Sequence, residues 1–423
     1  MENVTLNPRE QQRLRVFNEV NLGKLKLRQA SILMEISLRH TKRLLAGYRQ
    51  RGVVALAHGN RGRLPYNRID SRICEQIVEL AKSKYTGFNQ QHFTEKLQEQ
   101  EGITLSRSSV RRILLKESLP SPRKRRAPKH RSRRERYPKV GMLLQTDGSP
   151  HDWLEGRGPR LCLIGAIDDA NSEVPSAHFQ DQEDSAGYMQ MFQEITLNQG
   201  IPEALYHDQH SIFKVTDHKE SSLEDQLAGK EPLTQVGRVL RELGINSIGA
   251  NSPQAKGRIE RLWRTFQDRL VSELRLVGAR TKDEANQVLR RFLPEYNRKF
   301  TVPAREPGSA YRKPPEGFKP EEYFCFKYSR VVGADNVVRF GNQRLQVLPT
   351  PNRQSYARCQ VEVQHRLDGS LAVYYQGQPL DIQPAPPEAP TLRKANLIPV
   401  SASGVKTTIK VSKPTPWKRW VYR

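Results

Sequence analysis

The sequence predicts a multidomain protein with helical domains first, an α/β domain next and short β-strands near the end. The chain has 423 residues, which is too long for one ordinary domain. Its apolar residues recur at helical spacing before residue 120, alternate between strand-like and helical patterns from 140, and become strand-like after 320. Glycine-rich, basic or proline-rich segments separate these regions, as expected of domain boundaries.

The charge of the chain predicts a polyanionic partner. Seventy Lys and Arg residues outnumber 45 Asp and Glu residues, which gives a net charge of +25. Such a surplus favours nucleic acid over a membrane, because the longest apolar runs, such as 161–167, are too short to span a bilayer. The polar N-terminus does not resemble a secretory signal. The four cysteines form no CxxC pair, which argues against a disulfide framework or zinc finger and fits a reducing cytoplasm.

Residues 1–57 and 66–120 each predict a helix-turn-helix domain. In the first, Ser37 is a candidate N-cap for a recognition helix at 38–49, and in the second Ser106 is the equivalent residue. The alternative is a solvated basic helix in an ordinary helical bundle. The glycine-rich break at 58–65 can follow a phosphate backbone. The expected DNA contacts in these regions are Arg39, Lys42, Arg43, Arg61, Arg63, Arg107, Arg111 and Arg112.

A basic linker is expected at 121–139, where ten Lys or Arg residues accompany one Glu. No hydrophobic core can form there. It is either a solvated linker or an arm that orders on DNA by neutralising phosphates, and both can hold. The expected phosphate contacts are Arg123, Lys124, Arg125 and Arg126.

Residues 140–300 predict an α/β core. Three strands come first, ending near Asp147, near Asp168 and at Gln180, and helices then alternate with two further strands. Three sequential strands form an antiparallel meander, whereas later strands join in parallel through crossover helices, which is a ribonuclease-H-like layout. The polar segment 211–233 is expected to be an insertion. After the core, short strands at 320–378 predict a small β-barrel, and 379–423 predict a flexible basic tail.

Three acidic residues of the core predict a metal site. Asp147 and Asp208 are expected at the ends of neighbouring strands, and Glu260 one turn into a helix that can pack across the same edge. Converging carboxylates repel one another unless a cation neutralises them, and all-oxygen ligands select Mg²⁺ or Mn²⁺. Two such ions can activate an attacking oxygen and stabilise a leaving one in phosphodiester chemistry. The basic residues expected to hold DNA phosphates beside this site are Lys256, Arg258 and Arg264.

Each of these assignments has a structural alternative. Glu260 could instead form a surface ion pair with Arg264, which is common on helices. Asp152, Asp168 and Asp169 lie near the core and could be mistaken for ligands, but Asp168 and Asp169 suit a turn better. The histidines that flank the expected ligands, His151 and His207, more often serve as structural hydrogen-bonding residues.

The segments LLQTDGSPHDWL, AIDDANSEVPSAHF, LYHDQHSIF, NSPQAKGRIERLWRTFQDRL and LPEYNRKFTVPAREPGSAYR resemble the DDE transposases of the retroviral integrase superfamily, in the ISNCY group near the IS481-type elements. The resemblance implies that Asp147, Asp208 and Glu260 form the catalytic triad. It also implies recognition of terminal inverted repeats, exposure of 3′-hydroxyls, their joining to target DNA, and at least a dimer on double-stranded DNA in a bacterial cytoplasm, near the nucleoid.

Two departures from the family and three rival functions accompany this interpretation. The 51 residues between Asp208 and Glu260 exceed those of compact integrases, and no His-His-Cys-Cys module precedes the core.

A tyrosine recombinase is one rival function. It would explain HRSR at 130–133 and Tyr422, although the HRSR match lies in a low-complexity linker. A domesticated DNA-binding protein and a stand-alone nuclease are the other two. The sequence contains no GxxxxGK[ST] segment, so no nucleotide cofactor is expected.

Overall fold

A computed structural model describes residues 5–58, 60–61, 63–122, 127, 134–208, 210–215, 233–250 and 256–386. The chain divides into two compact units. Unit 1 comprises Met1–Arg134, Pro150–Leu161 and Glu260–Tyr296, and unit 2 comprises Glu135–Ser149, Cys162–Ile259 and Asn297–Arg423. The predicted linker contacts 123–126 lie outside the described residues, as do most of the predicted insertion and nearly all of the predicted tail.

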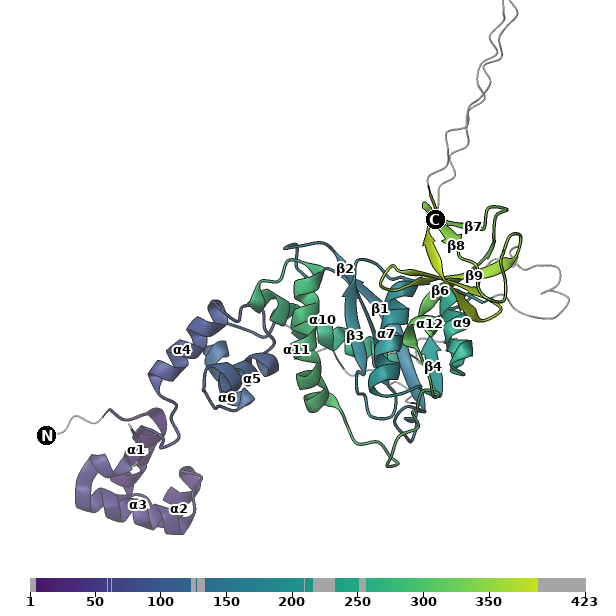
Figure 1. Cartoon of the computed structure of the whole chain (residues 1–423). Helices are drawn as coiled ribbons and strands as arrows, with labels where there is room; N and C mark the ends of the chain where they lie inside the picture. Colours follow the sequence, from purple (N-terminus) through teal and green to yellow (C-terminus); the bar gives the residue numbers. More distant parts are fainter. Residues whose placement is uncertain are drawn as a thin grey trace, which may run out of the picture. The chain divides into compact units, whose positions relative to one another are not determined.

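The first helical cluster of unit 1 contains α1 (Pro8–Asn21), α2 (Leu27–Leu33), α3 (Leu38–Arg51) and a 3-10 helix (Gly52–Leu56), drawn in purple in Figure 1. Phe17, Leu45 and Leu56 form its buried core. Ser37 begins α3 as predicted, because its side chain accepts a hydrogen bond from the His40 backbone N–H. The helix-turn-helix assignment of this cluster stays a prediction.

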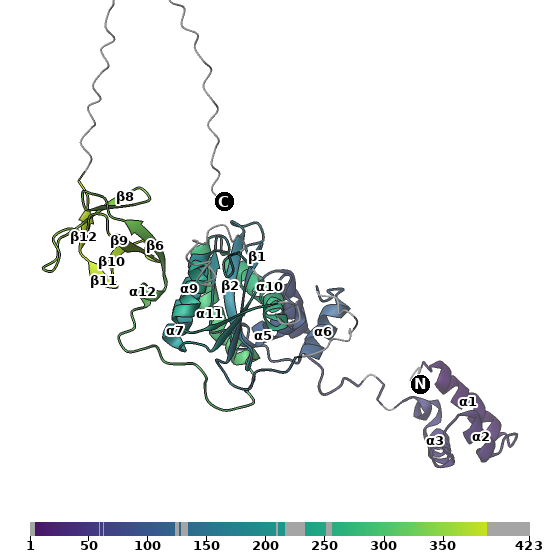
Figure 2. The ribbon, with the colours of Figure 1, turned by 90° about the vertical axis from the view of Figure 1, so that its right-hand side faces the viewer.

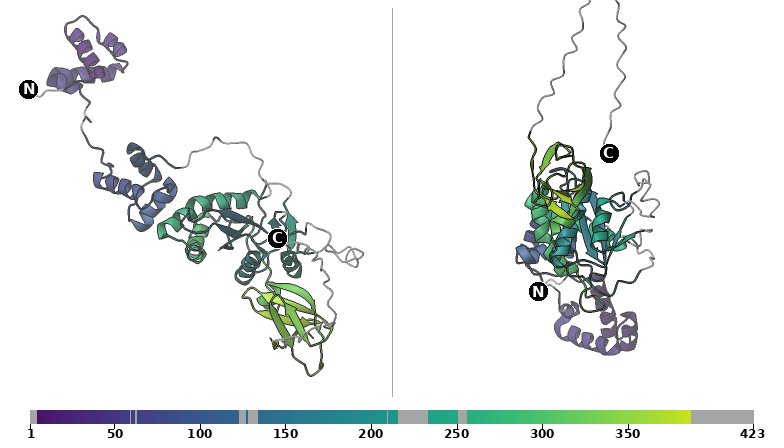
Figure 3. Two further views of the ribbon diagram at one scale, coloured as in Figure 1. Left: turned by 90° about the horizontal axis from the view of Figure 1, so that it is seen from above. Right: turned by 45° about the vertical axis from the view of Figure 1, so that its right-hand side comes forward.

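A second helical cluster of unit 1 contains α4 (Ser71–Lys82), α5 (Gln90–Gln100) and α6 (Arg107–Lys116). Its core is built from the apolar positions of all three helices, including Ile77, Phe93 and Val110. Ser106 caps α6 as predicted, by accepting from the Ser109 backbone N–H. The two clusters therefore begin their third helices in the same way, and Figure 3 shows each as a compact group of helices.

Two long helices, α10 (Gly257–Val277) and α11 (Lys282–Phe300), belong mainly to unit 1. α10 contacts α5 through two ion pairs. Arg269 of α10 pairs with Glu95 of α5, and Lys96 Nζ of α5 lies 2.8 Å from Glu273 Oε1 of α10. Both helices carry charged residues along their length, and within the described ranges no helix is apolar enough over a sufficient length to cross a membrane.

The five-stranded sheet of unit 2 has the order β3-β2-β1-β4-β5. Its strands are β1 (Leu143–His151), β2 (Leu161–Asp168), β3 (Ser176–Gln180), β4 (Ala204–His207) and β5 (Asn246–Gly249). β2 and β3 pair antiparallel, whereas β4 pairs parallel to β1 and β5 parallel to β4. Parallel neighbours need crossovers, which α7 (Ser185–Asn198) and α9 (Gln235–Glu242) supply. The three sequential strands and the two parallel additions agree with the predicted order.

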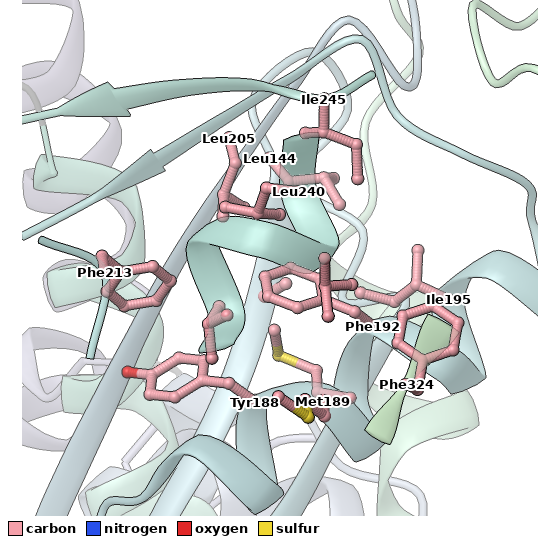
Figure 4. Close-up of a cluster of buried hydrophobic side chains, with 14 of the residues drawn as sticks. Leu144, Tyr188, Met189, Phe192, Ile195, Leu205, Phe213, Leu240, Ile245 and Phe324 are labelled. Carbon is pink, nitrogen blue, oxygen red and sulfur yellow. The ribbon is translucent and has the colours of Figure 1, made fainter. Parts of the chain in front are cut away.

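The main core of unit 2 lies between this sheet and helices α7 and α9. Leu144 and Leu205 from the sheet meet Phe192 from α7 and Leu240 from α9, as Figure 4 shows. Phe324, which follows the short helix α12 (Pro320–Tyr323), fills the same cluster. The C-terminal strands are thereby attached to the α/β domain by buried apolar contact.

The described C-terminal strands form two sheets around one apolar core and do not close into a single barrel, so the predicted small β-barrel is not confirmed. One sheet has the order β11-β10-β9-β6 and the other β12-β8-β7. Figure 2 labels most of these strands, which are β6 (Cys325–Val331), β7 (Val337–Phe340), β8 (Gln343–Val347), β9 (Gln360–Arg366), β10 (Leu371–Tyr375), β11 (Gln378–Leu380) and β12 (Ile382–Pro384). Pro349 and Pro351, which cannot donate to a strand ladder, separate the strands β8 and β9 of different sheets. β12 also lies beyond the predicted boundary at 378.

Candidate active site

Asp147 and Asp208 lie at the same level of two neighbouring strands. In the parallel pair β1–β4, Leu143 is opposite Ala204 and Gln145 is opposite Tyr206. The same register, continued by two residues, places Asp147 opposite Asp208, which immediately follows β4. Residues in register on adjacent strands have neighbouring side chains. The prediction that β1 ends at Asp147 was wrong, because the strand continues to His151.

The ammonium group of Lys256 joins these two aspartates. Its Nζ lies 2.7 Å from Asp147 Oδ1 and 3.8 Å from Asp208 Oδ2. The two carboxylates therefore lie close enough to interact with one cation. The Lys256 side chain is 12% exposed, against 21% for Asp147 and 42% for Asp208, so the aspartates face solvent more than the lysine does.

A buried polar network fixes the start of α10 on the sheet. Asp169 is fully buried and accepts from Arg258 Nε at 2.7 Å and from Gln145 Nε2 at 2.8 Å. Gln145, also fully buried, accepts from the Ile259 backbone N–H at 3.3 Å. The Arg258 guanidinium thus neutralises a buried carboxylate that would be costly to leave unpaired, and the predicted DNA contact of Arg258 would have to compete with this pair.

Glu260 follows Ile259 in the first turn of α10, where the sequence predicted it. Its carboxylate makes no hydrogen bond or ion pair within the part of the chain that the structure describes, so the alternative pair with Arg264 does not form there. Among the same residues, no three His, Cys, Asp or Glu side chains are grouped to hold a metal ion. The structure thus brings together Asp147, Asp208 and Lys256, and the convergence of all three acids stays a prediction.

The remaining acids near the site have structural roles. Asp168 accepts from the backbone N–H groups of Ala170 at 2.8 Å and Gly141 at 2.7 Å, which confirms the turn interpretation. Burial raises the pKa of Asp168 to about 6, although these two donors act in the opposite direction. Asp169 lies in the same turn, but its carboxylate belongs to the network at the start of α10. Asp152 accepts from Gly156 N at 3.0 Å within a tight turn.

His207, which precedes Asp208, is a structural residue. Its ring stacks on Phe213 with 4.2 Å between centroids, and its Nε2 lies 2.7 Å from the Ser247 hydroxyl. Burial lowers its pKa, so the ring is neutral at pH 7. His151 packs edge-on against Trp153. Both histidines therefore agree with the structural alternative.

Comparison with known proteins identifies the family of the chain. It is 33% identical over 382 residues to the protein named "Putative transposase y4bF" of Sinorhizobium fredii, covering 89% of this chain and 81% of that protein. It is 31% identical over 365 residues to the transposase for insertion sequence IS1202 of Streptococcus pneumoniae, covering 78% and 76%. The chain belongs to the transposase family. No family profile matches it.

Solved structures share less with this transposase. A simian T-cell lymphotropic virus intasome in complex with a PP2A regulatory subunit matches 74% of the chain and all of that chain, with 14% identity and a TM-score of 0.29. The HTLV-2 integrase catalytic core in complex with magnesium matches 35% of the chain and 82% of that chain, with 16% identity and a TM-score of 0.25. The placement of this transposase near the IS481-type elements stays a prediction.

The predicted DNA contacts of this transposase differ in whether their side chains are exposed or are engaged with other residues of the protein. On α3, Arg39, Lys42 and Arg43 are exposed while Thr41 and Leu45 face the core. On α6, Arg107, Arg111 and Arg112 are exposed in the same way. Arg63 and Arg264 are also exposed.

Arg61 is instead engaged within the protein. Its guanidinium pairs with the Glu10 carboxylate and donates to the Thr5 carbonyl. It ties residue 61 to the start of α1, so a phosphate contact would have to compete with Glu10.

Two features of this transposase site were not found from the sequence. Gln145 is a polar residue within an apolar strand, and that contrast was the available signal for its role in anchoring α10. Gly148 was not singled out either. A Cβ atom added there would lie 2.4 Å from the Glu183 carboxyl carbon, so this carboxylate packs directly against the backbone that follows Asp147. Glu183 is held by the buried Tyr188 hydroxyl at 2.6 Å.

Proposed function

We propose that the chain is a DNA transposase that cleaves the ends of its element and joins them to target DNA, with Asp147, Asp208 and Glu260 as catalytic carboxylates. The observation that carries the proposal is the parallel register of β1 and β4, which places Asp147 beside Asp208, together with the one cation that they share. The relatives that cover most of the chain supply the reaction class, because both are named transposases.

The donor set fits a divalent metal centre of two Mg²⁺ or Mn²⁺ ions. Asp147 and Asp208 offer carboxylate oxygens that are partly exposed, and the Lys256 ammonium beside both of them supports a site for a cation. Glu260 supplies the third carboxylate under this proposal, because it lies one residue beyond the anchored turn of α10. When bound, such ions would polarise the phosphodiester and promote ionisation of the attacking hydroxyl.

The protein residues position this chemistry. The Asp169–Arg258 pair and the Gln145–Ile259 hydrogen bond hold the first turn of α10 on the sheet, and that turn carries Glu260. Rigid placement of charged groups before the reaction lowers the reorganisation required in the transition state. Lys256 and the exposed Arg264 are expected to hold DNA phosphates.

The helical clusters of unit 1 are proposed to bind the terminal inverted repeats. Exposed arginines on α3 and α6 project from helices whose opposite faces are buried, which suits a groove-binding helix. The complex is proposed to contain at least two chains on double-stranded DNA, because two ends must be joined, and to form in the bacterial cytoplasm on the nucleoid. A domesticated, inactive DNA-binding protein is the competing proposal, and only an activity assay separates the two.

The deciding experiment compares wild-type protein with Asp147→Asn on DNA carrying the element's ends. Asp147→Asn should lose end cleavage and strand transfer in Mg²⁺ while it still binds the ends. Asp283→Asn, which removes an exposed carboxylate on α11, serves as the matched control and should remain active. Equal strand transfer by Asp147→Asn and wild type would disprove the triad, and an inactive wild type would favour domestication.

The DNA-binding part has its own test. Binding of the full chain to terminal repeats and to unrelated DNA should be compared over a series of salt concentrations. Specific binding should exceed non-specific binding at each salt concentration, and both should weaken as salt rises because phosphate contacts release counterions. Equal affinities for the two DNAs would contradict sequence recognition.

A further inference from the structure

Lys256 has a position that phosphate binding alone does not explain. A lysine whose only partner is DNA gains by extending its ammonium into solvent. Lys256 instead keeps 88% of its side chain covered and directs Nζ between two carboxylates of its own chain. Asp147 accepts at hydrogen-bonding distance, and Asp208 lies within ion-pair distance.

We propose that Lys256 is a positioning residue that serves as the counter-ion of Asp147 and Asp208 and is displaced when a divalent cation binds them. The proposal rests on the proposed function, because it assumes that these two aspartates are metal ligands. It adds a competition between the protein's own cation and the metal.

The competition follows from electrostatics. The Asp147 oxygen that accepts from Lys256 is one of the oxygens available to coordinate a metal, and an ammonium group held there repels a second cation at short range. Lysine suits such an exchange better than arginine does. Its charge is a compact ammonium on a flexible stem, whereas a guanidinium makes a planar two-point contact that is harder to release.

The exchange has a consequence for DNA binding. While the two aspartates hold the Lys256 ammonium, it cannot contact a DNA phosphate. Once a metal ion displaces it, the ammonium can contact a phosphate. Metal binding and the Lys256–phosphate contact should therefore favour each other. A single lysine would then link metal occupancy to retention of the DNA end.

The first test measures Mn²⁺ binding to the full chain without DNA, by titration calorimetry. Lys256→Met should bind Mn²⁺ about two- to fivefold more tightly than wild type, because no internal cation has to leave. This range corresponds to the loss of a partly exposed ion pair. Lys256→Arg should not gain affinity. Arg264→Met removes an equal charge from an exposed position on α10 and should change Mn²⁺ affinity by less than Lys256→Met does.

A second measurement uses the wild-type protein, so that it does not depend on a variant folding. The rate at which an amine-reactive reagent acetylates Lys256 should rise when Mn²⁺ is added, as followed by mass spectrometry. The exposed Lys116 on α6 should react at the same rate with and without Mn²⁺.

The outcomes separate this inference from the proposed function. Unchanged or weaker Mn²⁺ binding by Lys256→Met, or a Lys256 acetylation rate that Mn²⁺ does not raise, would overturn the inference. Asp147→Asn provides the other comparison. If it binds Mn²⁺ as well as wild type does, the ligand assignment itself fails; if it loses binding while Lys256→Met gains none, only the exchange fails.

Discussion

The substitution Asp169→Leu should test whether one buried carboxylate holds the start of α10 in place. The Asp169 carboxylate accepts hydrogen bonds from Arg258 Nε at 2.7 Å, Gln145 Nε2 at 2.8 Å and the Tyr137 backbone N–H at 2.9 Å. Asp169 is fully buried and the Arg258 side chain is 12% exposed. Removing the carboxylate therefore leaves a largely buried guanidinium without its counter-ion.

The expected destabilisation is large. Removing one partner of a buried ion pair costs about 3–5 kcal/mol, because the remaining charge is desolvated without compensation. Replacing both partners with apolar residues costs much less. The double variant Asp169→Leu/Arg258→Met should therefore recover most of the loss, so that the two substitutions are strongly non-additive.

Hydrogen exchange followed by mass spectrometry is the suitable assay, because it reports the free energy of local opening for each peptide. Peptides from β1 and the first turns of α10 should lose protection in Asp169→Leu, and should regain it in the double variant. Peptides from α1 to α3 serve as the internal control. A loss below about 1 kcal/mol in the single variant, or additive effects in the double variant, would refute the reasoning.

Two further predictions concern the same unit. Gly148→Ala should destabilise the protein by about 1 kcal/mol, because the new Cβ displaces the end of the Glu183 side chain and its hydrogen bond from Tyr188 is lost. Gly257→Ala, where an added Cβ has nothing within 4 Å, is the control, and equal urea midpoints would contradict this displacement. Asp168 has a folded-state pKa of about 6, above its ordinary value of 3.8, so its contribution to stability should fall as pH rises from about 4 to about 6. Asp168→Asn should flatten this part of the stability–pH curve, and an unchanged slope would disprove the assignment.

The sequence was sufficient to predict that Asp147 and Asp208 belong to neighbouring strands of one sheet. Alternating strand and helix patterns led to the sheet order, and the position of Asp208 directly after an apolar strand led to its pairing with Asp147. The N-caps Ser37 and Ser106 were also predictable, because a side chain that caps a helix depends only on nearby residues.

Tertiary contacts were not predictable in the same way. Arg258 and Arg264 both look like exposed basic residues on a helix, yet Arg258 is buried against Asp169, which is 89 positions away in the chain. Gly148, Ser149 and Pro150 resemble a turn, but β1 continues through them. The number of C-terminal sheets depended on long-range strand pairing, which the short strands do not specify individually.

The partners of each acidic residue decide which of them can take part in metal chemistry. Asp169 has no exposed surface and accepts from Arg258, Gln145 and Tyr137, so its oxygens are already bound within the protein. Asp147 and Asp208 share one ammonium and remain partly exposed, so they can change partner without unfolding the sheet. Under the proposed function, the buried Asp169–Arg258 pair gives the site its rigidity, and the partly exposed Asp147 and Asp208 give it exchangeable ligands. Substitutions in the Asp169–Arg258 pair should lower stability more than activity. Substitutions of Asp147 or Asp208 should lower activity more than stability.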